Sequence, residues 1–244
     1  FLIILCTCSK CSYLSIQTTS VRNDSNIQTV TTKIKDKNQG ESEEMEENEN
    51  GPIFTTIELV SYRDVKYLGD IYVGSPFIKY QVIYDTGSTI FWLASNNCTT
   101  LSCQKYENKY NPDNSTSSND LHLRQNITYA IGFVRGRLYS DTVSLNHHVN
   151  HKKLYNKELI AKDCNILCIY NEKYITETIA DGVLGLGINN EGDNKYSLIK
   201  LLYEQNQITA PSFSFYLLNN IGKNVSRVYI GAIMEHKYIP TLFK

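Results

Sequence analysis

The chain has 244 residues, of which 41% are hydrophobic, so it can bury a sizeable core in one large domain or two small ones. Its formal net charge is −1, and its Lys and Arg residues are scattered along the chain. That charge pattern provides no basic surface for nucleic acid, and we therefore expect a globular protein that does not bind nucleic acid.

The first residues, Phe1–Cys6, form an apolar run, and the first methionine is Met45. So short a run fits the tail of a signal-peptide core, a truncated signal anchor or a buried strand. We favour a signal-peptide or anchor remnant over residues 1–16. This interpretation predicts a protein of the secretory pathway, either secreted or held in an acidic vacuole or organelle.

The segment 17–53 is polar and lacks a sustained hydrophobic period. Six glutamates fall within residues 41–50, where they repel one another and have nothing apolar to bury. We predict a disordered or loosely docked pro-segment or linker. A solvated spacer with no regulatory role is the alternative.

From residue 54 to 244 the sequence is typical of one mainly β domain, with short β-rich runs separated by Gly, Asn, Asp or Pro. The predicted strands are Thr55–Ser61, Lys66–Gly74, Lys79–Tyr84, Ile90–Ser95, Asn126–Ala130, Gly136–Leu145, Val183–Leu186, Ser212–Leu218 and Val225–Ile230. One amphipathic helix is expected at Ser197–Gln205, with Ser197 as its N-cap.

The motif Asp85-Thr86-Gly87-Ser88 lies between two apolar runs, residues 80–84 and 89–94. These runs resemble a strand pair buried on both faces, where an unpaired carboxylate would be costly, so Asp85 is expected to have a chemical task. Gly87 allows a tight turn, and the hydroxyls of Thr86 and Ser88 can hydrogen-bond to the carboxylate. The motif predicts a strand, a hairpin-like loop carrying an acid, and a second strand.

Cysteine spacing indicates a small covalent loop. Cys98 and Cys103 enclose four residues, a spacing that suits a disulfide and fits no common zinc-ligand pattern. A second bridge between Cys164 and Cys168 is left open. The other three of the seven cysteines lie in the first 16 residues.

Five segments carry a family resemblance when taken in chain order. They are Tyr67–Pro76, Asp85–Ser88 with Trp92, the Cys98 and Cys103 pair, Ile127–Val143, and Ala180–Gly187. Together they resemble the N-terminal lobe of pepsin-like aspartic proteases. The bias toward Asn, Lys, Ile and Tyr is similar to that of plasmepsin-type members. The resemblance implies that residues 54–244 form the N-terminal lobe of a pepsin-like bilobal β-barrel fold.

The resemblance also assigns roles to individual side chains. Asp85 would be one of two catalytic carboxylates that share a proton and activate a water against the peptide carbonyl. Ser88 would orient the outer oxygen of Asp85, and Gly87 would let the substrate backbone approach. Tyr129 matches the flap tyrosine, whose hydroxyl could pair with the indole N–H of Trp92. Without the order of the motifs, core packing would be the better interpretation of these two aromatics.

Further positions are implied to contact substrate. A hydrophobic specificity pocket would lie at Ile83, Tyr174 and Val183. The flap tip would offer its main chain at Ile131 and Gly132. Where the family usually has Gly followed by Thr or Ser, this chain has Ala130 and Ile131, which stiffens the tip and removes a hydroxyl.

No second Asp-Thr-Gly or Asp-Ser-Gly occurs in the 244 residues. Our leading hypothesis is the N-terminal half of an aspartic endopeptidase that hydrolyses polypeptides, needs no metal or organic cofactor, and requires the missing C-terminal lobe as its partner. The chain alone would then be inactive as a monomer. The alternatives are a catalytically silent single lobe that binds peptides or a partner, and a homodimer of two lobes. The reading frame beyond Lys244 would separate the first two hypotheses.

Overall fold

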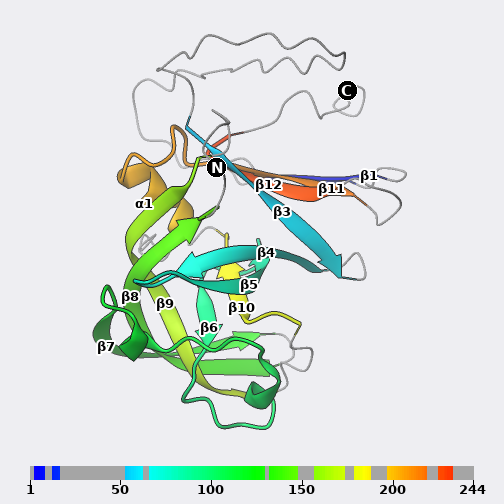
Figure 1. Cartoon of the computed structure of the whole chain (residues 1–244). Coiled ribbons are helices and arrows are strands. Elements are labelled where there is room, and N and C mark those ends of the chain that lie inside the picture. The colour runs from blue at the N-terminus through cyan, green and yellow to red at the C-terminus, as the bar shows by residue number, and fades with distance from the viewer. Residues whose placement is uncertain are drawn as a thin grey trace, which may run out of the picture.

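The computed structural model describes residues 3–8, 13–16, 53–62, 66–129, 132–147, 157–173, 179–187, 197–218 and 225–232. Strands dominate this part of the chain, so the predicted mainly β fold is confirmed (Figure 1). The strands are β1 (Ile3–Cys8), β2 (Tyr13–Ile16), β3 (Thr55–Tyr62), β4 (Lys66–Val73), β5 (Ile78–Asp85), β6 (Trp92–Ala94), β7 (Asn119–Tyr129), β8 (Gly132–Leu145), β9 (Leu159–Lys173), β10 (Gly182–Gly185), β11 (Phe213–Leu218) and β12 (Ser226–Ile230). Two short 3-10 turns are η1 (Cys103–Lys105) and η2 (Pro112–Asn114).

The predicted helix is present as α1 (Leu198–Glu204), beside β8 and β9 in Figure 1. Ser197 is its N-cap, because the Ser197 side chain accepts a hydrogen bond from the backbone N–H of Lys200 at 3.3 Å. Leu198 and Leu202 are buried on the face toward the sheet, which is why this short helix is stable only as part of the lobe.

The strands form one sheet in the order β2-β1-β11-β12-β3-β4-β5-β10-β6-β9-β8-β7, and β4 also pairs with β8. β10 is parallel to β5 and antiparallel to β6, so it separates the two strands that flank the acidic motif. The predicted hairpin-like connection is therefore wrong. A segment one hundred residues further along the chain, with Gly185 opposite Asp85, is inserted between the two strands.

Burial alternates along β5, which corrects the expectation of a strand buried on both faces. Tyr80, Val82 and Tyr84 are buried, whereas Ile83 and Asp85 lie on the opposite, partly exposed face. Successive side chains of a strand point to opposite faces, so apolar residues of β5 point into the core and Asp85 points away from it. The carboxylate thus costs less than it would in a fully buried strand pair.

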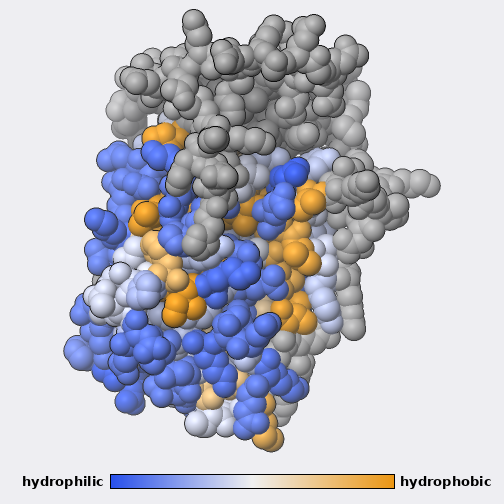
Figure 2. Space-filling view, viewed as in Figure 1, coloured by the Kyte–Doolittle hydropathy of each residue, from blue (hydrophilic) through white to orange (hydrophobic). Residues whose placement is uncertain are grey.

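Two apolar clusters form the core. The larger one joins β3, β4, β5, β9, β10 and α1, and Ile71, Val82 and Leu184 are fully buried in it. The smaller one surrounds Trp92, with Leu138 and Leu167 among its members. The face in Figure 2 has hydrophobic patches set among a mainly hydrophilic described surface, as expected when most apolar residues pack inside.

The longest strand, β9, was not predicted from the sequence. Positive φ at Asp163 (56°) and a register shift between Asp141 and Val143 of β8 interrupt its alternation. A β-bulge places an extra residue in the strand, so a period of two is lost at that point.

Cys164 and Cys168 are both buried free thiols on β9, so the possible second bridge is not formed. Residues four apart on an extended strand are separated by about 13 Å, whereas a disulfide needs Cα atoms within about 7 Å.

At the N-terminus, residues 3–8 form β1, which pairs in parallel with β11 and antiparallel with β2. The predicted pro-segment or linker, 17–53, lies almost wholly outside the described residues, and the predicted domain boundaries stay predictions. None of the helices in the described ranges is long and apolar enough to cross a membrane.

Candidate active site

Asp85 ends β5 on its partly exposed face and begins the acidic loop, residues 85–89. Its Oδ1 atom accepts a hydrogen bond from the backbone N–H of Gly87 at 2.9 Å. Behind it, the backbone carbonyl of Asp85 accepts from the N–H of Leu186 at 2.7 Å. The carboxylate is therefore held by its own turn, and the backbone that carries it is held by the residue that follows β10.

Glycines let β10 approach this loop. A Cβ on Gly185 would lie 2.4 Å from the backbone nitrogen of Ile90, and a Cβ on Gly187 would lie 2.7 Å from the carbonyl oxygen of Ser88. The N–H of Gly187 donates to that same Ser88 carbonyl at 2.7 Å. Only glycine permits backbone contacts this close, so the second motif of the sequence, Ala180–Gly187, cradles the first.

A buried carboxylate, Asp181, holds the start of β10 in place. Asp181 is 3% exposed, and its side chain accepts hydrogen bonds from the N–H of Gln81 (2.9 Å) and from the backbone and side chain of Asn108 (2.8 and 3.1 Å). It therefore ties β10 to β5 and to the segment after η1. No role was predicted for Asp181 from the sequence, although a carboxylate that opens a buried apolar run is itself a signal of a hydrogen-bonded acid.

The predicted flap is a long hairpin of β7 and β8, paired from Asn119 with Ser140 up to Tyr129 with Gly132. The Trp92 indole donates a hydrogen bond to the Tyr129 hydroxyl at 2.8 Å, so the predicted pairing of these two side chains is present. Burial raises the pKa of Tyr129, and the nearby Asp85 carboxylate raises it further. The flap hydroxyl thus lies within the electrostatic reach of the acid.

Ser88 does not make the contact predicted for it. Its hydroxyl oxygen is buried and has no hydrogen-bond partner in the described part of the chain, so neither Asp85 oxygen is held by Ser88. The Ser88 hydroxyl lies close enough to Tyr129 to lower the pKa of that phenol, yet no hydrogen bond of acceptable geometry joins them. The donor to the Asp85 carboxylate is a backbone N–H, that of Gly87, and the role predicted for Ser88 is not seen.

The predicted pocket residues lie in one row across three strands. Val183 of β10 is opposite both Ile83 of β5 and Trp92 of β6. Ile83 and Val183 are partly buried, and Val183 packs with Tyr129 against the cluster around Trp92. The sheet therefore brings together an acid, an apolar row and the flap tyrosine. Three other predicted positions, Ala130, Ile131 and Tyr174, lie outside the described residues.

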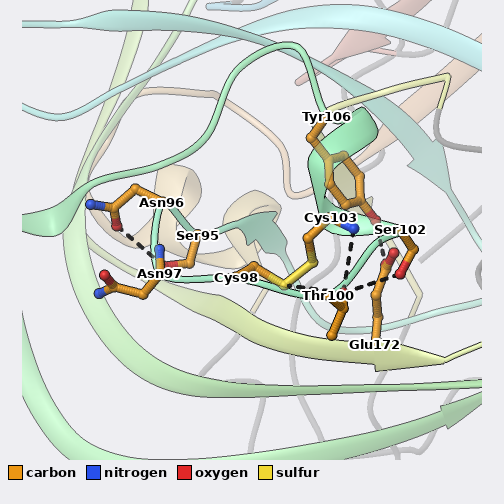
Figure 3. Close-up of a disulfide and its surroundings, with 9 residues drawn as sticks. All are labelled: Ser95, Asn96, Asn97, Cys98, Thr100, Ser102, Cys103, Tyr106 and Glu172. Atoms are coloured by element: carbon orange, nitrogen blue, oxygen red, sulfur yellow. Dashed lines mark hydrogen bonds between the residues drawn. A yellow bond between two sulfur atoms is a disulfide. The ribbon is translucent and has the colours of Figure 1, made fainter.

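The disulfide predicted from cysteine spacing joins Cys98 to Cys103, directly after β6 (Figure 3). Both cysteines are buried in the cluster around Trp92. Tyr106 follows three residues later, and its ring meets that of Trp92 edge to face at 87° and 6.5 Å between centroids. Such a pair contributes about 0.5–1.5 kcal/mol beyond the area it buries.

A half-buried acid at the end of β5, a glycine-lined strand behind it and a tyrosine-bearing hairpin beside it are the parts of one lobe of the pepsin-like class. The family model of the eukaryotic aspartyl proteases matches residues 66–243, so the chain belongs to that family.

Curated relatives agree with the family. The chain is 28% identical over 193 residues to pregnancy-associated glycoprotein 2 of Bos taurus, covering 78% of this chain and 47% of that protein. It is 29% identical over 159 residues to pepsin B of Canis lupus familiaris, covering 65% and 38%. With aspartic proteinase A3 of Arabidopsis thaliana it shares 29% identity over 171 residues, covering 67% and 31%. The chain thus spans less than half the length of these relatives.

Proposed function

We propose that this chain supplies one catalytic half of an acid-dependent aspartic endopeptidase, with Asp85 as one carboxylate of a proton-sharing pair. One carboxylate of the pair takes a proton from water while the other donates to the developing oxyanion, so the reaction needs a second acid from outside these 244 residues. Membership of the aspartyl protease family and the likeness to pepsin B support this proposal.

The observation that carries the proposal is the combination of Asp85, held by the Gly87 N–H, with the Trp92 to Tyr129 hydrogen bond beside it. A structural aspartate would need more donors to stay buried, as Asp181 has. Among the described residues, Asp85 instead leaves one carboxylate oxygen without a protein donor, and it lies on a partly exposed face. That is the arrangement a general acid or base requires.

Substrates would be extended polypeptides, bound through main-chain hydrogen bonds, with apolar side chains placed over Ile83 and Val183. Secretion or delivery to an acidic vacuole fits the family, since pepsin-type members act in such compartments. The partner of the chain would be a C-terminal lobe that provides the second aspartate.

The test uses a longer protein that joins this chain to a lobe with a second Asp-Thr-Gly or Asp-Ser-Gly. Asp85→Asn should abolish acid-optimum cleavage of an unfolded protein, while circular dichroism stays that of the wild type. Asp70→Asn, a substitution of an exposed acid on β4, is the matched control and should leave turnover unchanged. Retained turnover in Asp85→Asn would refute the assignment.

A second candidate function is a catalytically silent lobe that binds peptides, because the chain itself contains a single Asp-Thr-Gly and no Asp-Ser-Gly. The purified monomer of this chain distinguishes the two proposals. Peptide binding without cleavage, together with a stop codon directly after Lys244, favours the binding module. A reading frame that continues into a second acidic motif favours the protease.

A further inference from the structure

Glu172, near the end of β9, is a buried carboxylate that the proposed reaction does not use. It is 4% exposed, and its Oε2 atom accepts a hydrogen bond from the Tyr106 hydroxyl at 2.5 Å (Figure 3). Its Oε1 atom is buried and has no partner among the residues that the structure describes. A carboxylate in the core is costly unless it is hydrogen-bonded, so Glu172 and the group that donates to it hold each other in place. The group it fixes here is the phenol of Tyr106.

Tyr106 is held at both ends. Its backbone follows η1 and the Cys98 to Cys103 disulfide, and its hydroxyl is anchored on β9 by Glu172 (Figure 3). A tyrosine has two soft side-chain torsions, so fixing its backbone and its hydroxyl leaves the ring a single orientation. In that orientation the ring stands at 87° to the indole of Trp92.

Trp92 transmits the constraint to the flap. Its ring packs against Tyr106 on one side, and its Nε1–H donates to the Tyr129 hydroxyl at 2.8 Å. Trp92 is 3% exposed, so its ring cannot turn without displacing these neighbours.

We propose that Glu172 and Tyr106 form a positioning pair that sets the orientation of Trp92 and, through it, the resting position of the flap Tyr129. The pair acts through the ring contact between Tyr106 and Trp92 and lies outside the acidic loop that carries Asp85. Its value for catalysis rests on the proposed protease function, whereas its effect on Trp92 does not.

Trp92 is the sole tryptophan of the chain, so its indole N–H gives one resonance in a proton–nitrogen correlation spectrum. Tyr106→Phe keeps the ring and removes the hydroxyl. We expect it to shift this resonance and to speed its hydrogen exchange roughly fivefold, the equivalent of one net hydrogen bond of about 1 kcal/mol. Glu172→Leu should give the same result, and combining the two substitutions should add little, because both remove one interaction.

Two further variants separate positioning from general stability. Glu172→Gln retains an acceptor for Tyr106 and should bring the indole resonance back toward its wild-type position. Tyr110→Phe removes an equivalent bond, from the Tyr110 hydroxyl to the buried Asp141 at 2.7 Å, in the larger apolar cluster rather than in the one around Trp92, and should leave the resonance unmoved. If Glu172→Leu does not fold, the isosteric Tyr106→Phe and Glu172→Gln carry the test.

A wild-type indole resonance and exchange rate in folded Tyr106→Phe would overturn the proposal, even if that variant melted at a lower temperature. The outcome is independent of proteolysis. If the protease assignment fails but the indole resonance shifts in Tyr106→Phe, the positioning pair is still supported. If the enzyme is active but the indole resonance does not move, only the positioning pair is refuted.

Discussion

Asp181→Ala should be among the most destabilising single substitutions in this lobe. Hydrogen bonds to a charged group contribute about 1.5–3 kcal/mol each, and Asp181 accepts three of them. The Asn108 side chain lines an open cavity of about 220 Å³ and can turn to water, but the backbone N–H groups of Gln81 and Asn108 lose their acceptor. We therefore expect the free energy of unfolding to fall by about 3–4 kcal/mol.

Urea denaturation followed by circular dichroism measures this change as a lower midpoint at an unchanged slope. Asp181→Asn keeps one acceptor oxygen and should lose about half as much. Asp70→Ala is the control, because the Asp70 side chain forms an exposed ion pair with Lys79 at 3.4 Å, which contributes about 0–1 kcal/mol. A loss below about 1 kcal/mol in Asp181→Ala would refute the role of Asp181 as the clamp of β10.

Three other substitutions or conditions test the frame around the acid. Gly185→Ala places a Cβ 2.4 Å from the backbone of Ile90. It should lower the free energy of unfolding by about 2–4 kcal/mol in the same urea assay. A change below about 0.5 kcal/mol would contradict the close approach of β10 to the acidic loop. Replacing Cys98 and Cys103 together by serine should cost about 2 kcal/mol in thermal or urea unfolding, because the closed loop is short; an unchanged midpoint would show that the bridge does not constrain the unfolded chain. Burial raises the pKa of Cys164 to about 12 and that of Cys168 to about 11, from a reference value of 9.0. Both folded pKa values lie above the unfolded one, so this contribution to stability is complete below about pH 9 and is lost as the pH rises toward 11 and 12. Between pH 8 and 10.5, the urea midpoint should therefore fall less in the Cys164→Ala, Cys168→Ala double variant than in the wild type. An equal fall in both proteins would contradict the raised pKa values of the two thiols.

Local chemistry made much of the lobe predictable from the sequence. The helix after Ser197 has a cap and an apolar face within eight residues, so its signal is complete in a short window. The acidic turn, the short disulfide loop and the Trp92 to Tyr129 pair were likewise predictable, the last because the motifs occur in a family order.

The features that could not be predicted from the sequence depend on the register between strands that are distant in the chain. Nothing near Asp85 shows that β10 lies beside it, since parallel pairing across one hundred residues leaves no local pattern. Glu172 and Tyr106 are 66 residues apart, and each is unremarkable in its own segment. Ser88 shows the opposite error, because a hydroxyl three residues from a carboxylate in sequence is buried without a hydrogen bond to it, while the backbone N–H of Gly87 donates to Asp85.

The insertion of β10 between β5 and β6 also orders events during synthesis. The acidic loop is complete only when Gly185 and Leu186 reach the carbonyl and backbone of Asp85, one hundred residues after that acid leaves the ribosome. At a synthesis rate of about 5–20 residues per second, this leaves a delay of about 5–20 s in which the acidic loop lacks its contacts with β10. A nascent chain that ends before β10 therefore carries the Asp-Thr-Gly motif without an organised acid, and the site is built by the later half of the lobe.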